Sequence, residues 1–465
     1  MQRLKGGDAV YLYQETPSAP QHTLKVSIMR PLHPHADKER AKQFFLATIH
    51  RVPALRWRIV PVPFGLHHPL AIEDPEFDLD NHFNHVALPG AGTMRELDEM
   101  VAQIASNPLD RNRPLWEMWM IEGLEDGRLA FVLKAHHAIA DGMASVNLFT
   151  RMLSPISPDE SVPEWRPRGL PGARRLVLGA IRDHLRYDAL KFPEFLRTVL
   201  ARQKSARIHR KASQVPVFDP MEDIIPPSRF NGALSPRRGF ATRSLPLADV
   251  RALKSQLEGT INDVILALVA GGLRRYLQDA GAPAEQPLIT VIPVSADEPG
   301  TERLFGNNIA IMGSRLHADI DDPLERFRAT RESTLAAKQF LEVYGRNTLP
   351  SITHYLLPAL VRIPRQREYR LKLADEPGYK YPCQVAVSNV PGPRERLETE
   401  QAVLESLYSV GPLQEGNGLN ITVWSYCDQL NFSVICCRKR VPDPDRIATA
   451  VETELEVLKE CVVAH

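Results

Sequence analysis

The sequence predicts a mixed α/β protein built from two related domains. Its 465 residues exceed what one hydrophobic core usually accommodates. Short apolar strands alternate with amphipathic helices on both sides of a central segment that is rich in proline and basic residues. With 43% hydrophobic and 24% charged residues, the composition is typical of an ordered globular protein.

The first domain is predicted to occupy residues 1–155. Turn residues at 125–128 separate two runs of alternating apolar and polar side chains, which is the pattern of a β-hairpin. Apolar residues at helical spacing predict the helices around it. Strands are expected at 24–29, 55–60, 115–121 and 128–137, and helices at 38–49, 95–107 and 143–153.

Residues 156–227 are predicted to form two proline-rich linkers around a basic helical insert. Lysine and arginine far outnumber acidic residues between Arg166 and Lys211. Apolar residues recur at helical spacing beside these charges, so we expect two basic amphipathic helices joined near Pro193.

The second domain is predicted over residues 228–465, again as mixed strands and helices. Its strongest patterns predict helices at 262–277 and 324–343, and strands at 288–294, 384–388, 419–426 and 429–435. The shared alternation of strands and helices indicates that the two domains are related.

Charge and cysteine content exclude several classes of protein. Lys+Arg 57 against Asp+Glu 56 gives a net charge of +1, so no basic excess points to a nucleic acid partner. The five cysteines are odd in number and contain no C-x-x-C pair, so we expect neither a disulfide framework nor a zinc site, and no other metal site is predicted.

Membrane contact is expected to be peripheral. The N-terminal residues lack the apolar core of a signal peptide. The longest apolar run, near residues 264–273, is about half of what a membrane-spanning helix requires. We therefore expect a cytoplasmic protein that reaches lipid only from its surface.

The strongest chemical signal is His136-His137-Ala-Ile-Ala-Asp141-Gly142, between a predicted strand and a predicted helix. Side chains alternate between the faces of a strand, so the two histidines are expected on opposite sides. An imidazole with a pKa of about 6.5 can exchange a proton at neutral pH. One histidine is therefore predicted to be a general base, and a pair of packed structural histidines is the alternative.

Three roles are open for Asp141: it orients an imidazole, caps the following helix or binds an arginine. Gly142 is expected to permit the backbone geometry of a tight turn. The sequence holds no G-x-S-x-G elbow, H-E-x-x-H helix, Walker A loop or G-x-G-x-x-G loop after a strand. A histidine that activates a substrate hydroxyl, without a covalent enzyme intermediate, is the chemistry that these observations favour.

The heptapeptide matches the HHxxxDG motif of the bacterial wax ester synthase/diacylglycerol acyltransferase family. That family belongs to the superfamily of CoA-dependent acyltransferases and peptide-synthetase condensation domains. The chain resembles the family over nearly its whole length, in the family's order. The matching segments are 53–58, 77–79, 109–117, 121–124, Asn262-Asp263, Gly306-Asn307-Asn308 and 388–393.

The resemblance implies two chloramphenicol-acetyltransferase-like domains with an active-site channel at their interface. It implies that His137 is the general base, that His136 supports it, that Asp141 is structural and pairs with an unidentified arginine, and that Gly142 keeps the turn open. Further residues are implied to line the substrate path, with core packing as the alternative for the last three: Asn262, Asp263, Ser388, Asn389, Pro114, Leu115 and Trp116.

The implied reaction is the transfer of a long-chain acyl group from acyl-CoA to diacylglycerol, to a long-chain alcohol or to both. Acyl-CoA is then a co-substrate, and no permanently bound cofactor is expected. Asn262 is a candidate donor for the charge that develops on the carbonyl oxygen. One departure is Gln21, where the family usually has methionine, and it weakens inference about nearby acceptor contacts.

Two alternatives stay open at this point. The first is another acyl transfer of the superfamily, such as esterification of a polyketide or condensation on a carrier protein. The second is a catalytically silent lipid-binding protein that keeps the fold. The intact HHxxxDG motif argues against the second alternative, and the Asn262-Asp263 and 388–393 segments favour the lipid branch over the first.

Water-insoluble substrates give the basic insert a predicted role at a membrane or lipid-droplet surface. Each basic residue near an anionic leaflet contributes about 1 kcal/mol of attraction before salt screens it. A solvated helix pair over the domain junction and a site for CoA phosphates are the alternatives.

Overall fold

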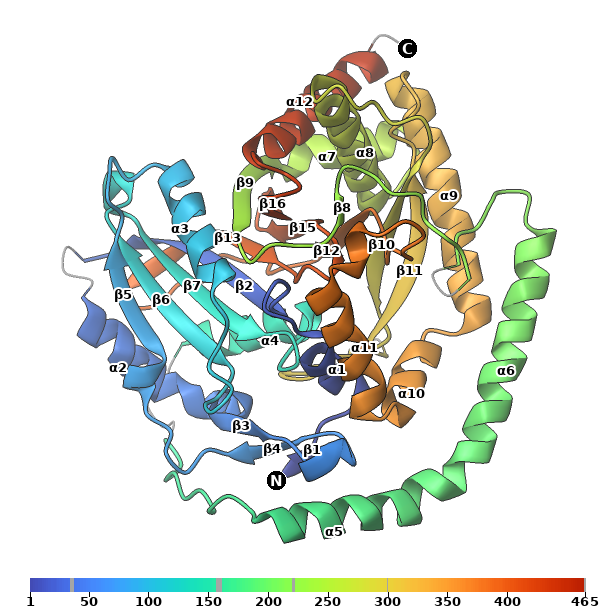
Figure 1. The fold of residues 1–465 in the computed structure, drawn as a ribbon. Coiled ribbons are helices and arrows are strands. Elements are labelled where there is room, and N and C mark those ends of the chain that lie inside the picture. The colour runs from blue at the N-terminus through green and yellow to red at the C-terminus, as the bar shows by residue number, and fades with distance from the viewer. Residues whose placement is uncertain (34–36, 156–160, 220–221, 299, 464–465) are drawn as a thin grey trace.

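The computed structural model describes all residues except 34–36, 156–160, 220–221, 299 and 464–465. Two β-sheets with helices packed on them form the body of the protein (Figure 1). The first sheet has the strand order β13 (Ala402–Val410), β2 (His22–Pro31), β7 (Leu129–His136), β6 (Trp116–Glu122) and β5 (Phe83–Ala87). The second has the order β11 (Ile309–Leu316), β10 (Leu288–Ser295), β12 (Val385–Val390), β15 (Leu419–Tyr426), β16 (Gln429–Cys437) and β9 (Arg238–Pro246). The predicted mixed α/β class is confirmed.

Different helices cover the two faces of the first sheet. Phe45 of α2 (Lys38–Thr48) and Leu148 of α4 (Gly142–Leu153) share a core with Leu129 and Leu133 of β7. The opposite face packs on α3 (Met94–Ser106) and on apolar residues from β9 and β16 of the second sheet. Alternate residues of β7 therefore enter two different cores.

The second sheet carries the largest hydrophobic core of the protein. Its strands pack with α7 (Leu247–Gln256), α8 (Ile261–Asp279), α9 (Pro323–Tyr344) and α12 (Asp445–Val463). Helix α8 begins with a capping box, in which the Thr260 hydroxyl accepts the Asp263 N–H and the Asp263 carboxylate accepts the Thr260 N–H. This cap explains why the helix begins at Ile261, close to the predicted start.

The basic insert forms a long helical strap along the outside of the molecule (Figure 1). It consists of α5 (Ala173–Asp183), a π-helical turn at His184–Asp188 and α6 (Ala189–Ala212). The expectation of a junction near Pro193 needs correction, because Pro193 lies inside α6 and the π-helical turn joins the two helices. A π-helical turn already interrupts the regular hydrogen-bond ladder, so the break falls there.

Two features cross the predicted division at residue 228. Strand β13 comes from the second half of the sequence but pairs with β2 in the first sheet. Helix α1 (Gly6–Gln14) contacts α10 (Thr348–Tyr355) and α11 (Pro358–Leu371). The boundaries at 155 and 227 stay a prediction, and the two halves exchange elements across them. In the part of the chain described here, no helix has the length and apolar content needed to cross a membrane.

Candidate active site

The alternation of β7 places the two motif histidines on opposite faces of the first sheet. His136 is the last residue of β7, lies opposite His22 of β2 and is completely buried. Leu129, Leu133 and Ala135 alternate with it and face the other side. His137 directly follows the strand, and its backbone N–H donates to the Gln21 carbonyl at 2.8 Å.

The His137 imidazole is held by residues from both halves of the chain. Its Nδ1 lies 2.9 Å from Oδ1 of Asn307, and its ring stacks on Tyr11 of α1 at 4.2 Å between centroids. The Asn307 amide nitrogen donates to the His137 carbonyl at 2.9 Å and to Asp8 at 2.9 Å. Because both amide hydrogens are used, the Asn307 oxygen is left to accept, so Nδ1 carries the proton. Nε2 of His137 therefore keeps its lone pair.

Burial is the main cause that lowers the pKa of His137, to about 4. The charge of Lys25 also lowers this pKa, whereas Asp141 and the hydrogen bond with Asn307 raise it. Near neutral pH the imidazole is consequently uncharged and able to accept a proton.

His136 lies behind the site rather than in it. Its Nδ1 accepts the Ala138 N–H at 3.1 Å, and its Nε2 lies 3.8 Å from a carboxylate oxygen of Glu15. Burial holds the pKa of His136 well below its usual value. These contacts fix the turn that carries His137, which fits a supporting residue.

Asp141 performs two of the three roles left open for it. Its Oδ1 accepts the Ala144 N–H at 2.9 Å and caps α4. Its Oδ2 accepts from the Arg303 guanidinium at 2.7 Å and from the Asn308 N–H at 3.0 Å. Arg303 also donates to Asp297 and is thus the arginine that sequence reasoning left unidentified. No hydrogen bond joins Asp141 to His137 among the contacts of the described residues.

Gly142 needs space rather than special backbone geometry. Its φ is not positive, unlike that of Gly306, so the expected turn geometry is not the reason for a glycine. A Cβ atom at Gly142 would lie 2.9 Å from Cγ2 of Val390 in β12, closer than packing allows. The glycine lets α4 begin directly against the second sheet.

The residues expected from the second half lie at the ends of α8 and β12. The Asn389 amide donates to the Asn262 oxygen at a long 3.4 Å, so these two side chains face each other. Asp263 is buried and directed to its own helix terminus as the cap described above. Ser388 is half-buried on β12. Within the described part of the chain, none of the four forms a hydrogen bond, ion pair or ring contact with His137, and their substrate contacts stay a prediction.

Pro114, Leu115 and Trp116 are buried where β6 begins. The Trp116 indole N–H donates to the Leu55 carbonyl at 2.6 Å, and its ring stacks on His82. Leu115 packs in a cluster with Ile139 and Ala140, the residues after His137. These contacts fit core packing that supports the site.

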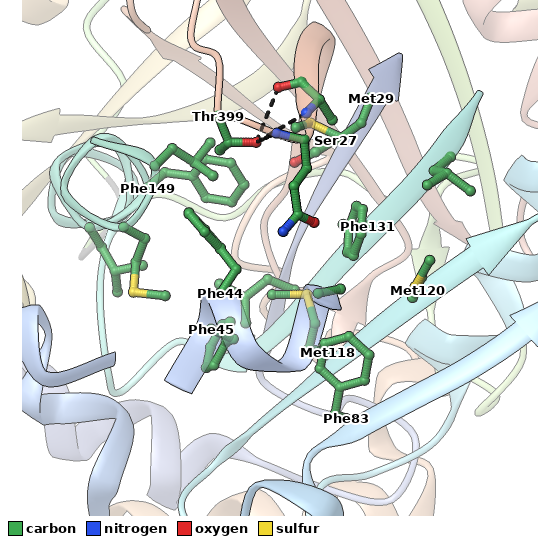
Figure 2. A pocket seen from close by; sticks show the side chains of 18 of the residues that line it. Ser27, Met29, Phe44, Phe45, Phe83, Met118, Met120, Phe131, Phe149 and Thr399 are labelled. Carbon is green, nitrogen blue, oxygen red and sulfur yellow. Dashed lines mark hydrogen bonds between the residues drawn. The ribbon is translucent and has the colours of Figure 1, made fainter. Parts of the chain in front are cut away.

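Three cavities share walls along the face of the sheet that carries His137. The first, about 370 Å³, is lined by Ala138, Ile139 and Asn307. The second, about 20 Å³, is lined by Ile139, Lys25, Leu133 and Leu148. The third, about 110 Å³, also contacts Leu133 and Leu148 and is almost wholly apolar. In Figure 2 the side chains around this third cavity point into it, and its labelled apolar residues are Met29, Phe44, Phe45, Phe83, Met118, Met120, Phe131 and Phe149.

Lys25, which lines the second of these cavities, is unusual because it is a buried lysine. Its ammonium donates to the hydroxyls of Thr23 and Ser409 at 2.7 and 2.6 Å. Burial lowers the pKa of Lys25 to about 7.

In the residues that the structure describes, no group of three or more potential ligands could hold a metal ion.

Comparison with known proteins identifies the family of the chain. The wax ester synthase/diacylglycerol acyltransferase catalytic domain matches residues 4–265, and the C-terminal domain of the same family matches residues 305–459. The chain belongs to the wax ester synthase/diacylglycerol acyltransferase family. Its members are acyltransferases, so the resemblance seen in the sequence is confirmed.

Individual relatives agree with this assignment. The chain is 38% identical to a protein of Mycobacterium tuberculosis named as a candidate diacylglycerol O-acyltransferase, over 97% of this chain and 94% of the relative. It is 33% identical to the O-acyltransferase WSD of Acinetobacter baylyi, over 83% of this chain and 82% of that protein.

Solved structures show the same fold. The wax ester synthase/diacylglycerol acyltransferase of Marinobacter aquaeolei VT8 matches with a TM-score of 0.68 and 27% identity, over 100% of both chains. The first condensation domain of the calcium-dependent antibiotic synthetase matches with a TM-score of 0.60 and 15% identity, over 99% of this chain and 96% of that one. The second likeness shows the fold alone.

Proposed function

We propose that this enzyme transfers a long-chain acyl group from acyl-CoA to the hydroxyl of diacylglycerol or a long-chain alcohol, with His137 as the general base. Family membership supports this acceptor class over polyketides, carrier proteins and a silent lipid-binding role. The observation that carries the proposal is the free Nε2 lone pair of a neutral His137, opposite the nitrogen that Asn307 holds.

In the proposed reaction Nε2 of His137 takes the proton of the acceptor hydroxyl as its oxygen attacks the thioester carbonyl carbon. The tetrahedral intermediate collapses with cleavage of the C–S bond, and the CoA thiolate recovers the proton from the imidazolium. Acyl-CoA is a co-substrate here, and no permanently bound cofactor takes part. Asn262, Asn389 and Ser388 are proposed to contact the substrates from the second sheet, with Asn262 as a donor to the carbonyl oxygen.

The acyl chain is proposed to follow the wall that the three cavities share. Leu129, Phe131 and Leu133 line the apolar cavity from β7, and His137 continues the same alternation at the end of the strand. At a rise of about 3.3 Å per residue, the six steps from Phe131 to His137 span roughly 20 Å. Each methylene that enters an apolar site contributes about 0.8 kcal/mol, so this wall favours long chains.

The helical strap is proposed to dock on an anionic membrane or lipid-droplet surface. Large apolar side chains on it face solvent, with exposed fractions of 67% for Leu178, 70% for Leu185 and 78% for Leu190. Arg174, Arg175 and Arg182 are exposed beside them. Leu176 and Ala180 of α5 and Val199 and Ala206 of α6 are buried instead, so the strap has a packed side and a free apolar, basic side. This combination is typical of helices that lie in a lipid interface.

Acyl transfer from radiolabelled palmitoyl-CoA to diacylglycerol and hexadecanol tests the proposal. The wild-type protein is expected to form triacylglycerol, wax ester or both. His137→Ala should lower kcat by roughly 10²- to 10⁴-fold because the general base is lost. His33→Ala, which removes an exposed histidine, is the matched control. Equal rates for His137→Ala and the control would refute the assignment of the base.

A further inference from the structure

We propose that Asp8 and Asn307 are positioning residues that hold His137 in the tautomer needed for catalysis, with Asp8 deciding which way the Asn307 amide faces. This inference rests on the proposed role of His137 as the base. Both residues line the cavity of about 370 Å³ beside His137, and the role proposed for them is exerted through the imidazole.

The contacts form a chain from α1 to the base. Oδ1 of Asp8 accepts both the backbone N–H and the side-chain Nδ2–H of Asn307. Asn307 in turn donates to the His137 carbonyl and accepts from Nδ1 of His137 at 2.9 Å. Asp8 is 4% exposed and Asn307 is 6% exposed, so both partners are shielded from bulk solvent.

The orientation of one amide selects the tautomer. An asparagine amide can present either its oxygen or its nitrogen to a neighbour. With the oxygen toward His137, the imidazole must carry its proton on Nδ1 and leave Nε2 free. With the nitrogen toward His137, Nδ1 would accept and Nε2 would carry the proton, which removes the base. The Asp8 carboxylate and the His137 carbonyl can only accept, so together they hold the amide nitrogen away from Nδ1, and Asp8 is the one of the two that a substitution can remove.

Close packing against α10 holds α1 in this position. Gly6 packs so closely on the backbone of Thr353 in α10 that a Cβ atom would overlap it. Gly306, with a φ of +82°, brings Asn307 beside Asp8, and a Cβ atom there would lie 3.3 Å from the carboxylate. Tyr11, one turn after Asp8, stacks on the imidazole. Helix α1 thereby contacts the base through both Asp8 and Tyr11.

Four variants test the inference by kinetics and by the ¹⁵N shifts of histidine-labelled protein, with His137→Ala used to assign the His137 signals. Asp8→Leu removes the carboxylate that orients the Asn307 amide. Asn307→Leu removes the oxygen that accepts from Nδ1 of His137. Asp8→Asn keeps an oxygen that can accept from Asn307. Asn112→Leu makes the same change as Asn307→Leu at an exposed position.

Asp8→Leu and Asn307→Leu are expected to lower kcat at least about 100-fold with less than about threefold change in KM, since a wrong tautomer costs up to about 10⁴-fold in the serine protease triad. Their His137 signals should move from the Nδ1–H toward the Nε2–H pattern. Asn307→Leu should also move the acid limb of kcat/KM to lower pH, because the Asn307 hydrogen bond raises the pKa of His137. Asn112→Leu should stay within about threefold of wild type, and Asp8→Asn, which keeps an accepting oxygen but adds donors, should lose less activity than Asp8→Leu.

Two outcomes are distinguishable. Loss of activity in Asp8→Leu and Asn307→Leu, with an unchanged Nδ1–H signal and acid limb, would mean that the residues only stabilise the fold and would overturn the inference. Wild-type activity in His137→Ala would instead overturn the proposed function.

Discussion

The protonation state of His137 decides at which pH the site can accept a proton, and Lys25 contributes to it. The Lys25 charge lowers the pKa of His137. Lys25→Met removes that charge while keeping a side chain of similar length. We expect the pKa of His137 to rise by about one unit at most. Because the base must be neutral, the acid limb of kcat/KM should then move to higher pH.

A pH–rate profile that extends from about pH 3 to pH 7 measures this shift, because it covers both sides of the pKa of His137 near 4. Lys254→Met, which removes an exposed lysine on α7, is the matched control and should leave the limb in place. An acid limb that moves to lower pH in Lys25→Met would contradict the sign of the interaction.

We predict that residue 142 accepts a larger side chain only if Val390 is replaced by a smaller residue. Gly142→Ala places a methyl group 2.9 Å from Val390 Cγ2, and overpacking of this kind costs about 1–3 kcal/mol. Val390→Ala alone leaves a small cavity. In the double variant the two changes should compensate, so its free energy of unfolding should exceed that of Gly142→Ala. Urea denaturation of all four proteins gives the coupling energy, and simple additivity would show that the two side chains do not meet.

At the scale of elements, the wall of β2 and β7 is predicted to set how long an acyl chain can be. Ser27 lies opposite Phe131, is 1% exposed and lines the apolar cavity. Its hydroxyl has no hydrogen-bond partner among the described residues. Ser27→Leu should fill the cavity roughly 20 Å from His137, by the strand rise of about 3.3 Å per residue. We expect kcat/KM to fall much more for palmitoyl-CoA than for octanoyl-CoA.

Ser255→Leu, an exposed change on α7, is the control for the added side chain. Equal losses for the two acyl-CoA substrates would show that the chain does not follow this cavity.

The strands of this wall were predictable from local patterns, but the distant residues and strand that they contact were not. The alternation of residues 128–137 predicted both β7 and the opposite orientation of His136 and His137. Arg303 and Asp8 carry no local signal, since they lie 162 and 129 residues from the motif residues that they serve. Residues 402–410 were not predicted as a strand of the first sheet, because β13 pairs with β2 across nearly the whole sequence. Contacts of this range depend on topology rather than on periodicity.

At the scale of the molecule, the two halves meet at the loop that carries His137. Ala140 forms a β-bridge with Gly306, and Asp141 binds Arg303 from the second half. Asn307 reaches His137 from the same loop as Gly306. His137 therefore acquires its geometry only when both halves are folded together, which explains why the motif alone could indicate the chemistry but not the arrangement.

The strap lies on the outside of this assembly and contacts it along one side, so changes on its free side leave the site intact (Figure 1). One variant replaces Arg174, Arg175 and Arg182 by Gln, and the control replaces three exposed arginines elsewhere, Arg95, Arg251 and Arg328. Both variants lose the same net charge and differ only in where it is lost.

Sedimentation with anionic phosphatidylglycerol vesicles and with neutral phosphatidylcholine vesicles compares the two. At about 1 kcal/mol for each basic residue, the strap variant should bind anionic vesicles roughly 100-fold more weakly in low salt, and raising the salt should shrink this difference. A second strap variant with Leu178, Leu185 and Leu190 replaced by Ser should bind both kinds of vesicle more weakly, because it loses apolar contact rather than charge. If both strap variants sediment like the control, the lipid surface is reached through another part of the molecule, since neither the charge nor the exposed apolar side of the strap then contributes to binding.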